Sequence, residues 1–177
     1  MVSSVTVPVA TAADVRFAVG ECDFGAILVA WSERGISAID LGDDAGELAL
    51  AFRHRVPEAR MIGGEPEVEM LVARVARFVE DPARGLDIPL DVTGTAFEQK
   101  VWAALRQIPV GETASYREVA RRIGSPTAVR AVARACAANR LAVAIPCHRV
   151  VASDGALTGY RWGIERKQLL LAREAGA

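Results

Sequence analysis

Two helix-start motifs constrain the second half of this chain more than any other feature of the sequence. Thr95 and Glu98 stand three residues apart, and Ser115 and Glu118 repeat the pattern. In such a capping box the hydroxyl and the carboxylate each accept a hydrogen bond from a backbone amide that the helix start leaves free. The sequence therefore predicts helices that begin just after residues 95 and 115.

A further helix is expected almost without a connection. Gly124 ends the helix that starts at Ser115, and Ser125-Pro126 supplies a cap residue and a proline suited to the first helical position. Residues 116–140 therefore predict a helix, a short turn and a helix. This is the pattern of a helix-turn-helix motif, whose second helix lies in the major groove of DNA.

The second of these helices, predicted over 127–139, is poorly suited to reading a base sequence. It is mostly alanine, and Arg130 and Arg134 are its main polar side chains. Arginine can pair with guanine, but alanine carries little base code. We expect DNA binding with little sequence preference, through phosphates and groove shape. An alanine-rich core helix is the alternative interpretation of this stretch.

Charge is divided unevenly along the chain. Residues 1–96 carry 8 arginines, no lysine and 16 acidic residues, a net charge of −8, whereas residues 97–177 carry 13 basic and 6 acidic residues, a net charge of +7. Basic side chains gain free energy when they displace counterions from phosphates. The second half is therefore expected to face a nucleic acid. Two solvated surfaces that merely differ in sign are the alternative.

The first half shows the patterns of strands. Apolar residues alternate from Val15 to Val19, and continuous apolar runs follow at 26–31 and 36–41. These patterns predict a three-stranded antiparallel meander with a buried middle strand.

Helices are expected next in the first half. They are predicted over 44–55 and from Pro66 onward, where apolar residues recur at helical spacing. The predicted fold class is α+β, with a small α/β domain at 1–94 and a mainly helical domain at 95–177.

The composition is that of a globular protein. The 177 residues are 51% hydrophobic, and no apolar run approaches the roughly 20 residues of a membrane span. We expect no signal peptide and no membrane partner. Cys22, Cys136 and Cys147 form no C-x-x-C pair, so neither a disulfide framework nor a thiolate zinc site is indicated. A reducing cytoplasm suits this cysteine usage.

Cys147 carries the clearest sign of chemistry. A lone buried cysteine is usually inert, but His148 and Arg149 adjoin this one, and a thiol becomes nucleophilic when a base or positive field generates the thiolate. Neighbouring side chains on a strand point to opposite faces, so the pair needs either a bend at Pro146 or a water that relays the proton. Glu174, on the predicted last helix, is available to orient the imidazole.

The segment around Cys147 also matches a known pattern, which consists of Pro146-Cys147-His148-Arg149-Val150, Asn139 eight residues before the cysteine, and Gly159-Tyr160-Arg161-Trp162. It resembles the O6-alkylguanine-DNA alkyltransferase family, and most closely the bacterial adaptive-response type. The resemblance covers residues 95–177, and the first half agrees in size and in strand and helix order. It implies a ribonuclease-H-like first domain and a helix-turn-helix catalytic domain.

The resemblance implies direct-reversal DNA repair, in which the alkyl group of O6-methylguanine, and of O4-methylthymine, passes once and irreversibly to the protein. Cys147 is implied to be the alkyl acceptor, His148 its water-linked base, and Glu174 the carboxylate that orients the base. Asn139 is implied to be a hinge between the recognition helix and the active-site loop. Tyr116 is implied to help rotate the nucleotide and to donate a hydrogen bond that stabilises the leaving guanine.

The same resemblance implies base flipping, with Arg130 filling the space that the nucleotide vacates. The other expected DNA contacts are Tyr116, Ala131, Arg134, Ala137 and Ser115.

Five residues are expected to form the substrate pocket. Val150 and Arg161 are implied to act mainly through backbone groups, and the family often has serine at the position of Arg161. Tyr160 is expected to line the pocket, and Cys136 to serve packing rather than chemistry. Trp162 is bulky where some members carry glycine, so we expect a narrow pocket that favours methyl over benzyl adducts.

No cofactor and no metal are expected, because Cys22 and His54 do not reproduce the zinc site of some relatives. The expected partner is double-stranded DNA containing O6-alkylguanine, bound by a cytoplasmic monomer. Three alternative functions stay open. The first is a sensor that binds the lesion without transferring the alkyl group, and the presence of Cys147 argues against it. The second is a helix-turn-helix regulator, and the alanine-rich helix argues against that. The third is a cysteine hydrolase, which would differ from a repair protein by converting many substrate molecules per protein.

Overall fold

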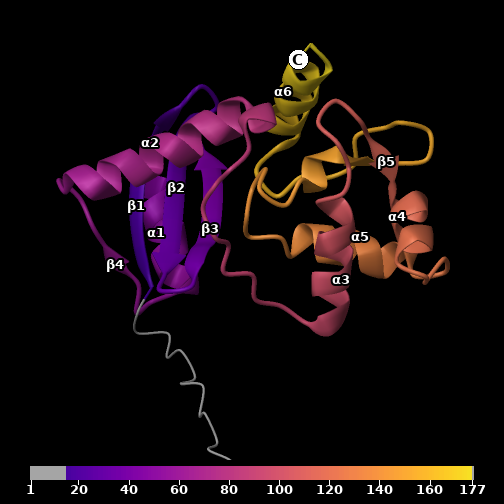
Figure 1. Ribbon diagram of the computed structural model, residues 1–177, viewed down its shortest axis with the longest axis horizontal. Helices are drawn as coiled ribbons and strands as arrows, with labels where there is room; N and C mark the ends of the chain where they lie inside the picture. The colour runs from indigo at the N-terminus through magenta and orange to yellow at the C-terminus, as the bar shows by residue number, and fades with distance from the viewer. Residues whose placement is uncertain (1–14, 177) are drawn as a thin grey trace, which may run out of the picture.

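The computed structural model describes residues 15–176, and its first half is built around a four-stranded mixed sheet (Figure 1). The strands lie in the order β3-β2-β1-β4. Their bounds are β1 (Arg16–Cys22), β2 (Gly25–Ser32), β3 (Gly35–Gly42) and β4 (Arg60–Met61). The three long strands form the predicted meander, but β4 pairs parallel to β1, so the prediction of a three-stranded antiparallel sheet was wrong. β4 has only two residues, both exposed, which is too few to produce an alternating pattern.

Helices cover both faces of this sheet (Figure 1). α1 (Ala45–Arg55) packs on one face and α2 (Pro66–Glu80) on the other, and both lie where helices were predicted. Ile27 and Leu28 are neighbours on β2, and both are fully buried because their side chains point to opposite faces. The continuous apolar run of β2 thus follows from its place in the middle layer.

The second half is mainly helical. After the 3-10 helix η2 (Pro82–Arg84), the chain forms α3 (Ala96–Leu105), α4 (Tyr116–Arg122) and α5 (Val129–Ala137), which pack against one another. Both predicted capping boxes are present, with all four amide-to-side-chain distances between 2.6 and 3.1 Å.

α5 is shorter than the helix predicted over 127–139. Ser125-Pro126 does not begin it, because these residues form a turn that the Ala128 amide closes on the Ser125 carbonyl at 2.9 Å. Ala128 then precedes the helix without any side-chain cap. Asn139 consequently lies beyond the helix end, in the chain that leads to Cys147.

Short elements and the last helix surround Cys147. The 3-10 helix η3 (Cys147–Arg149) leads into β6 (Val150–Val151), which pairs in parallel with β5 (Ala114–Ser115) directly before α4. α6 (Ile164–Ala175) lies between the sheet and the helices of the second half (Figure 1).

The sheet also positions the segment before Cys147. The Ile39 amide on β3 donates to the Arg140 carbonyl at 2.9 Å, and the Ala142 amide donates back to the Ile39 carbonyl at 3.1 Å. One cluster of buried apolar side chains extends from the sheet into α3, α5 and η3. Both halves therefore shape the surroundings of Cys147, and a domain boundary near residue 94 stays a prediction.

Candidate active site

Cys147 begins the single turn of η3 rather than standing on a strand. The chain bends at Pro146, whose φ of −81° and ψ of 60° are neither helical nor extended. Cys147 is 5% exposed, and its amide donates to the Ile145 carbonyl at 2.8 Å. A bend at Pro146, one of the two expected ways to place Cys147 and His148 in one site, is thus present.

Asn139 ties the end of α5 to this turn. Its buried Nδ2 donates to the Ile145 carbonyl at 2.8 Å and to Cys147 Sγ at 3.3 Å, and its Oδ1 accepts from the Leu141 amide at 2.9 Å. Between these contacts Val143 has a left-handed φ of 66°. That conformation costs a residue of this kind about 1–3 kcal/mol. The loop keeps this shape because the buried amide holds it on both sides.

His148, Arg149 and Glu174 form a buried polar cluster. His148 Nε2 lies 2.7 Å from Glu174 Oε1, and Arg149 donates to both oxygens of that carboxylate at 2.8 Å. Arg149 also donates to the Ile108 carbonyl at 2.7 Å. Burial alone would raise the pKa of Glu174, but the hydrogen bonds from His148 and Arg149 lower it to about 2. The ionised carboxylate therefore holds the proton of His148 on Nε2. The sequence indicated Arg149 only as a source of positive charge near Cys147, and it did not indicate the two hydrogen bonds from Arg149 to Glu174.

The thiol and the imidazole are both uncharged at rest. Burial raises the pKa of the Cys147 thiol, and the hydrogen bond from Asn139 and the charge of Lys167 offset this only in part. Burial likewise lowers the pKa of His148 despite its bond to Glu174. The lone pair of the neutral ring is then on Nδ1, a buried atom with no hydrogen-bond partner within residues 15–176. The site thus pairs a protonated thiol with a base in the following residue.

Lys167 is a functional candidate that sequence reasoning missed. This α6 residue is 1% exposed, and its amine donates to the Val150 carbonyl at 2.8 Å and to the carbonyls of Thr158 and Gly159 at 3.4 and 3.3 Å. Through these hydrogen bonds Lys167 connects the loop before α6 to strand β6. Its helical spacing from Leu170, on the buried face of α6, was the available signal.

Most of the predicted pocket residues meet on this loop. The Tyr116 hydroxyl donates to the Thr158 carbonyl at 3.3 Å. The Tyr160 ring meets Trp162 edge-on, with centroids 5.2 Å apart, and its hydroxyl is buried with no partner in the described part of the chain. Arg161 lies over the Trp162 ring, with its guanidinium carbon 5.9 Å from the ring centroid.

The remaining predicted site residues have ordinary structural positions. Cys136 is buried on α5, where burial raises the pKa of its thiol to about 12, and such a thiol suits packing rather than chemistry. The Ser115 hydroxyl caps α4, and Ala131 is half-buried. The Val150 carbonyl is already bonded to Lys167.

Three of the predicted DNA contacts lie on the exposed side of α5. Arg130, Arg134 and Ala137 are exposed, whereas Val132 and Ala135 are buried on the other side of the helix. The buried side of α5 belongs to the core, as the alternative interpretation of the alanine-rich stretch expected, and DNA binding by the exposed side stays a prediction.

Cys22 and His54 also lie apart from the site, at the end of β1 and on the exposed surface of α1. No three potential metal-binding side chains come together within residues 15–176. Over the same residues, none of the helices has the length and apolar character needed to cross a membrane.

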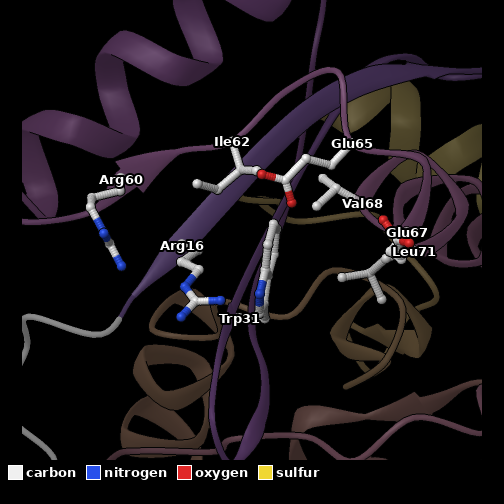
Figure 2. Close-up of a pocket in the computed structure, with 8 residues that line it drawn as sticks. All are labelled: Arg16, Trp31, Arg60, Ile62, Glu65, Glu67, Val68 and Leu71. Atoms are coloured by element: carbon white, nitrogen blue, oxygen red, sulfur yellow. The ribbon is translucent and has the colours of Figure 1, made fainter.

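A separate groove of about 490 Å³ lies on the sheet half (Figure 2). Strands β1, β2 and β4 and helix α2 contribute to it, through residues such as Arg16, Trp31 and Arg60. Neither Cys147 nor its neighbours His148, Arg149 and Glu174 line this groove.

A buried thiol followed by a neutral imidazole can supply a cysteine nucleophile. Residues 96–176 match the family described as 6-O-methylguanine DNA methyltransferase, DNA binding domain. The chain is 39% identical over 131 residues to the inducible methylated-DNA–protein-cysteine methyltransferase of Bacillus subtilis, covering 74% of this chain and 73% of that protein. A solved structure of Mycobacterium tuberculosis OGT in complex with DNA is similar with a TM-score of 0.76 and 32% identity, over 91% of this chain and 93% of that chain.

This chain therefore belongs to the methylated-DNA–protein-cysteine methyltransferase family. It is also 52% identical over 161 residues to the bifunctional transcriptional activator/DNA repair enzyme Ada of Escherichia coli, covering 91% of this chain. That match spans 46% of the Escherichia coli protein, so the chain covers about half the length of such relatives.

Proposed function

We propose that this protein repairs alkylated DNA by moving the alkyl group from O6 of guanine, or O4 of thymine, to Sγ of Cys147. The observation that carries the proposal is a buried thiol bonded to Asn139 at 3.3 Å, followed by a histidine that Glu174 holds at 2.7 Å. A thioether is not easily cleaved by water, so each molecule acts once.

The transfer follows from the protonation states of the resting site. His148 Nδ1 accepts the proton of the Cys147 thiol through a bridging water, and the imidazolium is stabilised by Glu174. The sulfur then attacks the alkyl carbon, the S–C bond forms as the C–O6 bond breaks, and the electron pair leaves with guanine. The Tyr116 hydroxyl donates a hydrogen bond to the departing base, where negative charge develops.

DNA binds along α5 in this proposal. α4, the turn and α5 act as a helix-turn-helix, in which Arg134 and Ala137 meet the groove and its phosphates and the exposed face offers little base code. The target nucleotide rotates out of the stack into the pocket, and Arg130 fills the vacated space. Binding tolerates any sequence that holds the lesion.

The proposal extends to the architecture. Residues 1–94 form a ribonuclease-H-like domain and residues 95–177 the catalytic domain. The protein acts as a cytoplasmic monomer, without cofactor or metal.

The proposal is tested by mixing the protein with duplex DNA that carries one O6-methylguanine and measuring intact and peptide masses. We expect one added methyl group on the Cys147 peptide, saturating at one per protein. Cys147→Ala should bind the duplex without gaining mass, and Cys22→Ala, a matched loss of a thiol outside the site, should be methylated like the wild type.

Two outcomes would overturn the proposal. Lesion binding without methylation of the wild type would place the protein among sensors or regulators. Turnover of many substrate molecules per protein, on an ester or amide, would indicate a cysteine hydrolase.

A further inference from the structure

A buried carboxylate of the sheet half reaches the pocket loop. Asp40 on β3 is 4% exposed, and its Oδ1 accepts from Trp162 Nε1 at 2.8 Å. The two residues are 122 positions apart in the sequence. The second carboxylate oxygen is bonded to Arg55 of α1. Asp40 thus joins the core of the first half to a residue expected to limit the width of the pocket.

Trp162 is held from two directions. Its indole N–H is bonded to Asp40, and its carbonyl accepts from Arg166 at 3.1 Å. Arg166 in turn bonds the Phe24 carbonyl at 3.0 Å and Asp43 at 2.5 Å, both in the sheet half. The loop before α6 has no helix or strand of its own over residues 152–163, so these side-chain contacts decide where the indole lies.

Trp162 contacts a second residue that is expected to line the pocket. Its ring meets Tyr160 edge-on at 5.2 Å, and the Tyr160 hydroxyl is buried. Burial raises the pKa of the Tyr160 phenol, and the charge of a thiolate at Cys147 would raise it further. A shift of the indole would therefore also shift the ring of Tyr160, another residue expected to line the pocket.

We propose that Asp40 is a positioning residue that sets the width of the substrate pocket by fixing the indole of Trp162, and so favours small alkyl groups. This inference rests on the proposed alkyl transfer. Without the carboxylate the buried indole N–H would lack its partner, and the ring would turn to find another. The pocket would then fit methyl less closely and admit larger groups more readily.

The test compares two substrates across a mutant cycle. Rates of transfer to Cys147 are measured with an O6-methylguanine duplex and with free O6-benzylguanine, for the wild type, Asp40→Ala, Trp162→Phe and the double variant. We expect Asp40→Ala to lower the ratio of methyl to benzyl rates about tenfold, the size expected when a hydrogen bond to a charged group is lost. Trp162→Phe should lower the ratio in the same direction. The double variant should match Trp162→Phe, because Asp40 acts through that ring.

The matched control is Asp91→Ala. Asp91 is another largely buried carboxylate of the first half, bonded to Ser32 at 2.6 Å and paired with Arg34 at 3.3 Å, and it does not contact Trp162. Its removal should leave the rate ratio unchanged, whereas a general loss of stability would change both variants alike.

The outcomes separate this inference from the proposed function. If the wild type does not transfer at all, the proposed function fails. If the wild type transfers and Asp40→Ala keeps its rate ratio, or if the two substitutions add independently, the role of Asp40 is refuted. Should Asp40→Ala not fold, Asp40→Leu replaces it, because leucine fills a similar volume, offers the indole N–H no acceptor and leaves the bulk of Trp162 unchanged. An unchanged ratio there would refute the role equally.

Discussion

Glu174→Gln is expected to destabilise the protein in a way that depends on pH. The carboxyl has a pKa of about 2 in the folded protein, against an ordinary value of 4.5. One pKa unit corresponds to about 1.4 kcal/mol, so the ionised group contributes about 3 kcal/mol to the free energy of unfolding at neutral pH. The substitution also leaves Arg149 buried without its counter-charge, which places the expected loss at about 3–5 kcal/mol.

The sign of the pH dependence follows from the lowered pKa. Stabilisation by Glu174 is fully present above the ordinary pKa of 4.5 and is lost as the pH falls toward about 2. The wild type should therefore lose stability over this range, and the difference from Glu174→Gln should shrink. His148 also has a lowered pKa and begins to weaken the fold as the pH falls below its ordinary value of 6.5. It does so more strongly in Glu174→Gln, which lacks the carboxylate that raises the pKa of His148, so the difference should first widen below 6.5 and then shrink below 4.5.

Urea unfolding at several pH values between about 7 and about 3 measures this difference. Glu165→Gln is the matched control, because Glu165 lies on the same helix and is exposed. It should unfold like the wild type. A gap between wild type and Glu174→Gln that stays constant with pH would refute the assignment of an ionised, clamped carboxylate.

Three further substitutions test other parts of the site. Cys147→Ala should abolish transfer while DNA affinity, measured by fluorescence anisotropy, stays within about twofold, and any residual stoichiometric transfer would exclude Cys147 as acceptor. Arg130→Ala should slow repair in duplex DNA more than reaction with the free base, and equal losses in the two rates would remove Arg130 from nucleotide flipping. Lys167→Met should lower the free energy of unfolding by about 1–3 kcal/mol, because the Val150 carbonyl loses its buried donor, and a variant with wild-type urea stability would contradict that role.

The sequence predicted those features that depend on neighbours along the chain. The capping boxes at Thr95 and Ser115 involve only residues three apart, and both are present. β4 and η3 were not predicted, because two or three residues carry no period. The clamp of Arg149 on Glu174 joins residues 25 apart, and no local pattern encodes such a pairing.

The left-handed turn at Val143 is another feature that the sequence did not predict. A β-branched residue does not favour a positive φ, so nothing at this position of the sequence indicates a left-handed turn. The turn exists because the buried amide of Asn139 bonds Leu141 on one side of it and Ile145 on the other. Family resemblance marked Asn139 as a hinge, but only the structure shows which conformation it holds.

In the proposed reaction each molecule uses its cysteine only once, and the burial of Cys147 and His148 suits such a reaction. A thiolate exposed to solvent would react with oxidants and other electrophiles, and each such reaction would inactivate one protein molecule. In this site burial keeps both Cys147 and His148 neutral, so the resting sulfur is a weak nucleophile. The ionised Glu174 and the Asn139 amide already face the positions where imidazolium and thiolate charge would form, so proton transfer needs no rearrangement of the protein. Reactivity would then depend on a substrate that fills the pocket and offers its alkyl carbon to the sulfur.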